Sequence, residues 1–102
     1  IKIRHANLSN LDSDFNITFF NSIIHLDLSF NKISIIMKKH FETNLRLRFL
    51  SLNNNKISVL ENYCFSLLSL LVSVDLSHNY IKKISWDLFH TNANSFNVLI
   101  LS

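Results

Sequence analysis

The chain has 102 residues with a formal net charge of +3, and 48% of them are hydrophobic, but it contains no glycine and no proline. Its densest apolar run, residues 65–74, is about half as long as the ~18 apolar residues that a membrane span needs, so a transmembrane segment is not expected. A single cysteine, Cys64, excludes an internal disulfide and a zinc cluster. A half-buried free thiol is expected there, with pairing to a cysteine outside these residues as the alternative.

The first residues predict an incomplete turn of a repeat. Ile1, Ile3 and Leu8 have the spacing of apolar residues that recurs later in the chain, whereas Ala6 stands where the later turns have an asparagine. Ile17 falls near a position that later turns fill with phenylalanine, after an insertion of one residue. Because the asparagine is missing, we expect this first turn to be looser than those that follow.

Three complete turns follow, and each opens close to the pattern xLxLSxN, with Asn53 in place of the serine in the second turn and Val74 in place of the first leucine in the third. The pattern ends at Asn31, Asn55 and Asn79, which are spaced 24 residues apart. With the asparagine counted as position 9, the alternation predicts one short strand in each turn. Positions 4 and 6 of that strand are expected in the core, and positions 3, 5 and 7 on the outer surface.

The asparagine and phenylalanine positions predict structural roles. A chain that turns sharply after a strand leaves backbone N–H and C=O groups inside, and each unsatisfied group costs about 1–3 kcal/mol. The asparagine amide has both a donor and an acceptor, so the three asparagines are predicted to form a ladder of hydrogen bonds. Phe41, Phe65 and Phe89 share position 19 and are expected to stack on the far side of the core.

The 24-residue repeat with asparagine at position 9 and phenylalanine at position 19 resembles the typical class of leucine-rich repeat. Extracellular arrays of this class include the ectodomains of Toll-like receptors, chaoptin-like adhesion proteins and slit-like ligands. The resemblance implies an α/β solenoid. It would be an arc with a curved parallel β-sheet on its concave face and mostly irregular or short helical segments on its convex face.

The resemblance covers residues 1–102 as one leucine-rich repeat domain of about four repeats. A solenoid needs terminal caps with a polar outer face, because an end turn otherwise exposes its core to water. Neither end of the sequence shows such a cap. We therefore expect the domain to be a fragment of a longer array, uncapped at both ends.

The outward side of the predicted strands is the candidate binding surface. Phe30 and Phe49 are expected to be exposed aromatics on adjacent strands, and cross-strand packing or contact with a partner explains such rings equally well. Charged and polar side chains surround them. The candidate binding residues of the concave face are His25, Asp27, Phe30, Arg48, Phe49, Ser51, Asp75 and His78.

Catalysis on this surface is not expected. Asp27 and Asp75 would lie two strands, or roughly 10 Å, apart. That separation is at or beyond the ~9.5 Å of the widest carboxylate pairs used in glycoside hydrolysis. His5 and His78 would lie three strands apart, too far to share a metal ion. We therefore expect a non-catalytic protein with no metal site and no cofactor.

The basic side chains predict a solvated exterior. The clusters at residues 38–40, 46–48 and 82–83 fall at different repeat positions, so they form no stripe along the array. No nucleic-acid partner is therefore indicated. The expected partner is a protein ligand or co-receptor, and a membrane would be reached only through a segment outside these residues.

Two N-x-[ST] sequons, at Asn7 and Asn16, lie off the concave face and would leave it open if they carried glycans. They favour an extracellular or cell-surface location over a cytoplasmic one. The sequence thus predicts a protein-recognition module of an extracellular or membrane-anchored receptor or adhesion protein. The alternative is an intracellular leucine-rich repeat scaffold or regulatory subunit.

Overall fold

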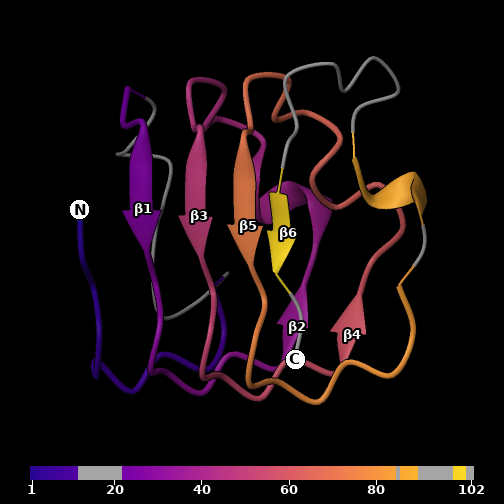
Figure 1. Ribbon diagram of the computed structural model, residues 1–102. Coiled ribbons are helices and arrows are strands. Elements are labelled where there is room, and N and C mark those ends of the chain that lie inside the picture. Colours follow the sequence, from indigo (N-terminus) through magenta and orange to yellow (C-terminus); the bar gives the residue numbers. More distant parts are fainter. Residues whose placement is uncertain (12–21, 85, 90–97, 101–102) are drawn as a thin grey trace.

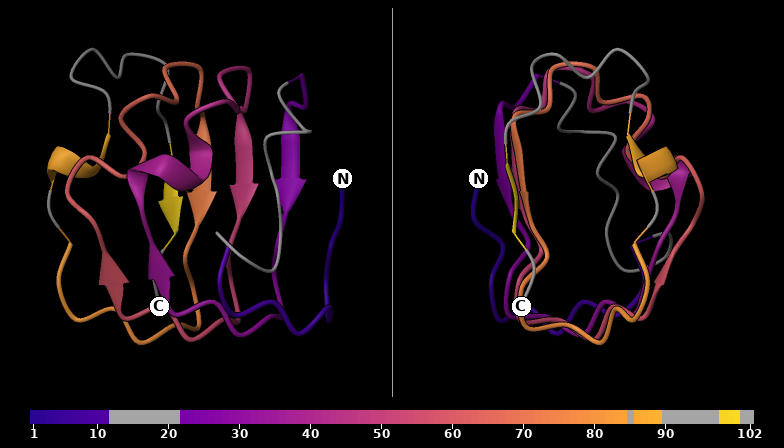
Figure 2. Two further views of the ribbon diagram at one scale, coloured as in Figure 1. Left: turned by 180° about the vertical axis from the view of Figure 1, so that it is seen from behind. Right: turned by 45° about the vertical axis from the view of Figure 1, so that its right-hand side comes forward.

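The computed structural model describes residues 1–11, 22–84, 86–89 and 98–100, with the backbone alone for Trp86 and for residues 98–100. Successive turns of the chain run side by side, and each complete turn adds one strand to a common sheet (Figure 1). The right-hand view of Figure 2 looks nearly along this stack. It shows the sheet on one side of the turns and the return segments on the other.

The main sheet has four short parallel strands. In spatial order they are β1 (His25–Asp27), β3 (Phe49–Ser51), β5 (Ser73–Asp75) and β6 (Val98–Ile100). A second, two-stranded parallel sheet pairs β2 (Ile35–Ile36) with β4 (Val59–Leu60) on the return side of the turns. Lys2 forms an isolated parallel bridge with Asp27, so the first turn lies beside β1.

The register of the main sheet follows the sequence repeat. His25 pairs with Phe49 and Phe49 pairs with Ser73, in steps of 24 residues, and Ser73 then pairs with Val98. The strands are parallel because each begins at the same point of its turn and the chain returns on the other side before the next one starts. The prediction of one parallel strand in each turn is confirmed.

Alternation along the strands places the core side chains as the sequence predicts. Side chains at positions 4 and 6 are at most 1% exposed: Leu26, Leu28, Leu50, Leu52, Val74 and Leu76. Ile33 and Ile57 at position 11 are also fully buried. Burial of one such side chain contributes about 1.5–3 kcal/mol. Strands of only three residues are therefore held in place by the packing of their turns.

The phenylalanine column lies on the return side of the core. The ring centroids of Phe41 and Phe65 are 5.9 Å apart, and those of Phe65 and Phe89 are 5.7 Å apart. Phe65, in the middle, is fully buried. Aromatic pairs at such distances add about 0.5–1.5 kcal/mol beyond the burial of their surface. The prediction that the position 19 rings lie next to one another is confirmed, but only Phe65 and Phe89 are stacked, since the Phe41 ring is tilted by 45° to that of Phe65.

Helical structure in the described residues is limited to two short 3-10 helices, η2 (Lys38–Phe41) and η3 (Trp86–Leu88). The expected short helical segments are present, but the α-helical part of the expected α/β class is wrong for these residues. Only residues 42–48 separate η2 from β3, and they must carry the chain back to the sheet, which leaves little length for an α-helix with its rise of only 1.5 Å per residue. No helix in the described part of the chain is long and apolar enough to cross a membrane.

Cys64 is buried, with 1% of its surface exposed, and not half-buried as the sequence predicts. The N–H of Cys64 donates to the Glu61 carbonyl (3.1 Å), and Tyr63 between them has a left-handed backbone conformation with φ of 62°. This tight turn directs the thiol into the core. Burial raises the pKa of the Cys64 thiol to about 12, so the thiol stays protonated at neutral pH.

Candidate protein-binding face

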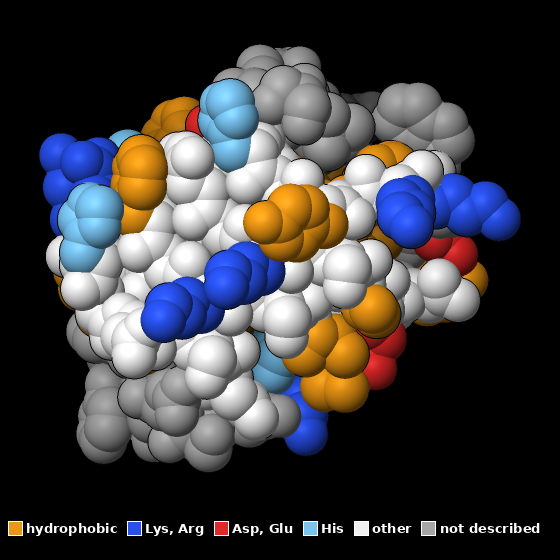
Figure 3. All heavy atoms as spheres, turned by 90° about the horizontal axis from the view of Figure 1, so that it is seen from below, with side chains coloured by type: hydrophobic (Ala, Val, Ile, Leu, Met, Phe, Trp, Pro, Cys, Tyr) orange, Lys and Arg blue, Asp and Glu red, His pale blue; other side chains and the backbone are white. Residues whose placement is uncertain are grey.

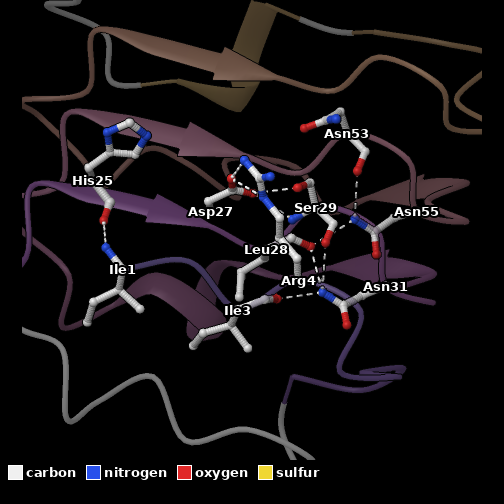
Figure 4. A network of polar contacts seen from close by, with 10 residues as sticks. All are labelled: Ile1, Ile3, Arg4, His25, Asp27, Leu28, Ser29, Asn31, Asn53 and Asn55. Atoms are coloured by element: carbon white, nitrogen blue, oxygen red, sulfur yellow. Dashed lines mark hydrogen bonds and ion pairs between the residues drawn. The ribbon is translucent and has the colours of Figure 1, made fainter.

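The asparagines at position 9 connect each turn to the turn before it. Asn55 Nδ2 donates to the carbonyls of Leu28 (3.1 Å) and Leu52 (3.0 Å). Its Oδ1 accepts from the N–H of Ile33 (3.1 Å). Asn31 and Asn79 make corresponding bonds. Figure 4 shows those that Asn31 Nδ2 donates to the carbonyls of Ile3 and Leu28. Because these amides are bonded to interior backbone groups, they hold the turns together and present little polar surface.

Asp27, a candidate binding residue, is almost fully buried, with 4% of its surface exposed. Its Oδ1 accepts from both the N–H (3.0 Å) and the hydroxyl (2.6 Å) of Ser29. Its Oδ2 forms an ion pair with Arg4 Nη2 at 2.7 Å (Figure 4). Burial alone would raise the pKa of the Asp27 carboxyl, but the bonds from Ser29 and Arg4 outweigh it and lower that pKa below its ordinary value.

The expected exposure of Asp27 is therefore wrong, although its side chain lies on the outward side of the strand. Arg4 from the first turn covers the carboxylate, and the short distance to Ser29 keeps it against the backbone. Asp75 is half-buried and repeats these bonds, since its Oδ1 accepts from the N–H (3.0 Å) and hydroxyl (2.6 Å) of Ser77. Ser51 lies at the equivalent strand position between Asp27 and Asp75. The middle of the outward side therefore carries short polar side chains that lie close to the backbone.

The exposed aromatic of the sheet lies where the strands begin. Phe49, the first residue of β3, is 39% exposed, and its ring centroid is 5.6 Å from that of His25, the first residue of β1. The Ile24 carbonyl accepts from the N–H groups of both Arg48 (2.8 Å) and Phe49 (3.0 Å), which fixes the start of β3 against β1. Ile24 is itself 52% exposed, and Arg48 is exposed beside it. We call His25, Arg48 and Phe49 the strand-start cluster.

Phe30 lies at the other end of the strands, in the turn that follows β1. It is 42% exposed, and its ring stacks on that of His5, with centroids 5.0 Å apart. Position 8 is left-handed in four successive turns, with φ of 53° at His5, 58° at Phe30, 58° at Asn54 and 56° at His78. The N–H of Phe30 donates to the Asn53 carbonyl (3.1 Å) and that of Asn54 to the Ser77 carbonyl (3.0 Å), so the next turn holds this conformation.

The structure thus divides the eight candidate residues into three places. His25 and Phe49 contact each other at the strand starts, where the exposed Arg48 precedes Phe49 in the chain. Phe30 and His78 lie in the turns after the strands. The expectation that Phe30 and Phe49 stand on adjacent strands is wrong, because Phe30 follows β1 and its backbone is left-handed. The remaining three residues lie side by side in the middle of the strands: Asp27, Ser51 and Asp75.

Sequence reasoning did not select Arg4, Ile24 and His5 for this surface. Arg4 and Asp27 are opposite charges at adjacent turns, which was the available signal for their ion pair. Nothing in the sequence predicted that Ile24 is exposed, because an isoleucine next to a strand is expected in the core. Among the described residues, no group of three or more His, Cys, Asp or Glu side chains is placed to hold a metal ion.

The repeat register and the bonding of the asparagines define the class of protein. A sequence model of the leucine-rich repeat family matches residues 45–96, about half of the chain, and the chain belongs to the leucine-rich repeat family. Members of this family are protein-binding modules and are typically non-catalytic. The chain is similar to Tsukushi of chicken (Gallus gallus), with 37% identity over 70 residues. The match covers 69% of the chain but spans only 19% of the length of Tsukushi.

Proposed function

We propose that the chain is a non-catalytic recognition module that binds a protein ligand or co-receptor through the outward side of its main sheet. The observation that carries the proposal is the strand-start cluster, where Phe49 remains 39% exposed although it contacts His25. Aromatic and arginine side chains are the residues most enriched at interface anchors. Phe49 and Arg48 supply both on a backbone that is fixed by two bonds to the Ile24 carbonyl.

Phe30 supports the proposal from the other end of the strands. A bulky residue with a φ of 58° is unusual, and a left-handed conformation at a residue other than glycine costs on the order of 1 kcal/mol. Asn54 occupies the same conformation one turn later at lower steric cost. A phenylalanine that is 42% exposed adds little to the core, so contact with a partner gives a reason for its presence.

The proposed setting is an extracellular or membrane-anchored receptor or adhesion protein, in which this sheet would be part of the concave face of a longer solenoid. Asn7, in the first sequon, is exposed and accessible to a glycan, whereas Asn16 lies outside the described residues. The similarity to chicken Tsukushi also favours an extracellular setting over a cytoplasmic one. The narrower proposal of a Toll-like or chaoptin-like protein is supported only by the resemblance of the repeats.

The setting can be tested by expressing the protein in a eukaryotic secretory host and measuring its mass before and after glycosidase treatment. We expect a loss of mass that disappears stepwise in Asn7→Gln and Asn16→Gln. Asn10→Gln, at an exposed asparagine whose third position is an aspartate and not a serine or threonine, is the control and should change nothing. Secreted protein without glycan at either asparagine would favour the cytoplasmic scaffold.

The binding surface can be tested against an array of purified extracellular domains, with the variants compared on each domain that binds. Phe49→Ala should weaken binding by roughly 30-fold, the equivalent of a ~2 kcal/mol anchor. Leu67→Ala is the matched control, because Leu67 is 40% exposed but lies beside η2 residues on the return side. All variants should keep the thermal stability of the wild type. If Leu67→Ala weakens binding while Phe49→Ala does not, the proposed face is wrong.

A further inference from the structure

A second surface of the molecule has an unusual charge distribution. The loops that follow the strands in four successive turns form one edge, which Figure 3 views directly. Lys, Arg and His side chains stand on this face, and Asp and Glu side chains show only near its margins. We call this surface the basic edge and define it as residues 32–35, 56–59 and 80–83, a set that contains no Asp or Glu.

Two lysines of the basic edge, Lys32 and Lys56, stand in register. The N–H of Lys32 donates to the Leu8 carbonyl (2.7 Å), and the N–H of Lys56 donates to the Ile33 carbonyl (2.9 Å). Equivalent bonds place the two lysines at the same position of adjacent turns, where strands lie about 4.8 Å apart. The expectation that basic residues form no stripe missed this pair, because it grouped residues that are neighbours along the chain.

Like charges at such a distance repel each other. Lys32, Lys56, Lys82 and Lys83 are all exposed, and none of them forms an ion pair with another described residue. The exposed carboxylates of the described residues, at Glu42 and Glu61, belong to the return side of the turns. On the return side these carboxylates lie with Lys38 and Lys39, whereas the lysines of the basic edge have no such carboxylates beside them among the described residues. The basic edge therefore attracts an anionic partner.

We propose that the basic edge binds a linear sulfated polysaccharide that lies across the turns. Lys32 and Lys56 lie on adjacent turns, and Lys82 and Lys83 follow shortly after the same position on the next turn. These charges therefore suit a polymer laid along the array. The lysine ammonium is a point charge on a flexible side chain, whereas the planar guanidinium of arginine fits a single carboxylate or phosphate with two bonds. Lysines therefore suit a polymer that carries many anionic groups close together. Sugar hydroxyls would meet exposed hydroxyl groups next to the lysines, at Ser34, Ser58 and Tyr80.

Other anionic polymers fit the basic edge less well. An extended acidic peptide presents side chains to one face only every ~6.8 Å, which does not match turns spaced by ~4.8 Å. Single-stranded nucleic acid binds by stacking its bases on successive aromatic side chains. Tyr80, which is 62% exposed, takes the position of Lys32 and Lys56 in the next turn. At this position the three turns thus offer a single ring, where the stacking of successive bases needs one in each turn.

The test is the binding of a heparin fragment of defined length to the full chain at several salt concentrations. Lys32→Gln/Lys56→Gln should bind about tenfold more weakly. Its plot of log K against log salt should be flatter by roughly one unit for each lysine removed. Lys32→Arg/Lys56→Arg should keep most of the affinity, because the charge remains. The matched control Lys38→Gln/Lys39→Gln, at exposed lysines on the return side, should bind like the wild type.

Three outcomes would overturn the proposal. The first is an equal loss of heparin binding in the Lys38/Lys39 control, which would show that net charge alone decides. The second is polyglutamate of equal charge binding as tightly as heparin, which would assign the edge to an acidic protein. The third is tighter binding of a single-stranded oligonucleotide of equal charge. Far-ultraviolet circular dichroism and thermal unfolding identify any variant that fails to fold. If the glutamine pair does not fold, the heparin affinity and salt dependence of Lys32→Arg/Lys56→Arg are compared with those of the Lys38/Lys39 control instead.

Discussion

The first turn and the central turns differ at one residue that changes how the interior backbone is bonded. In the turn that ends at Asn55, the Leu52 carbonyl accepts from Asn55 and also from Asn79 of the next turn (both 3.0 Å). In the first turn Ala6 replaces the asparagine, and the Ile3 carbonyl accepts only from Asn31 (2.9 Å) among the described side chains. The central carbonyls thus have two amide donors where the first turn has one.

This difference shows that each asparagine bonds the backbone of the turn before it as well as that of its own turn. Asn31 satisfies not only its own turn but also the first turn, because its Oδ1 accepts from the N–H groups of Ala6 (3.0 Å) and Leu8 (3.2 Å). A turn can therefore lack its own asparagine and still have its interior N–H groups bonded, provided that the next turn has one. Leu8 and Leu11 of the first turn are buried accordingly.

The largest effect is expected when a central asparagine is removed. Asn55→Ala would leave the Ile33 N–H without its partner and remove one of two donors from the Leu28 and Leu52 carbonyls. At about 1–3 kcal/mol for each buried group left unsatisfied, we expect a loss of roughly 2–4 kcal/mol in the free energy of unfolding. Chemical denaturation measures it. Asn62→Ala, at an exposed asparagine, should cost less than ~0.5 kcal/mol, and equal midpoints for the two variants would refute the role of the amides.

A smaller effect is expected from the ion pair that joins the first turn to β1. The lowered pKa of Asp27 means that its carboxylate stabilises the fold fully above about pH 4. This contribution is lost as the pH falls through the folded-state pKa. Asp27→Asn should cost about 1 kcal/mol at neutral pH, since a neutral acceptor replaces a charged one, and should flatten the loss of stability in acid. Unfolding measured as a function of pH gives both quantities.

Asp75→Asn is the comparison for this prediction. Asp75 makes the same two bonds to Ser77 but no ion pair with a described residue. If Asp75→Asn changes the acid dependence as much as Asp27→Asn, then Arg4 contributes nothing and the serine bonds carry the effect.

The smallest effect is expected from giving the first turn its own asparagine. In Ala6→Asn, the new amide could donate to the Ile3 carbonyl, as Asn31 does to the Leu28 carbonyl at 2.9 Å. Because Asn31 already bonds this turn, we expect a gain of less than ~1 kcal/mol in unfolding free energy. A gain as large as the loss in Asn55→Ala would show that bonds within a turn, and not those between turns, dominate.

The sequence predicted the fold where one physical cause dominated. Burial of apolar residues with a fixed period placed the leucines, the phenylalanine column and the parallel register correctly. The degree of burial at outward positions was not predictable in the same way, because it depends on contacts between turns. Asp27 is outward by alternation but covered by Arg4, which comes from 23 residues earlier.

The candidate site was predicted less well for a related reason. Alternation says which side of a strand a residue faces, but it gives no information after the strand ends. Phe30 lies in that turn, and its left-handed backbone decides where its ring points. The register of Lys32 and Lys56 was readable from the repeat, since both follow an asparagine directly. That the two lysines share one surface follows from the fold, because the loops after the strands lie side by side.

The cross-turn amide bonds also decide how backbone N–H groups exchange with solvent. The N–H of Ile33 is held by Asn55 Oδ1 and that of Ile57 by Asn79 Oδ1 (2.9 Å), each from the following turn. Exchange at these buried positions requires two turns to separate, and not the fraying of a single strand. Slowly exchanging amides should therefore recur once in each turn, and their opening free energies would report the coupling between neighbouring turns directly.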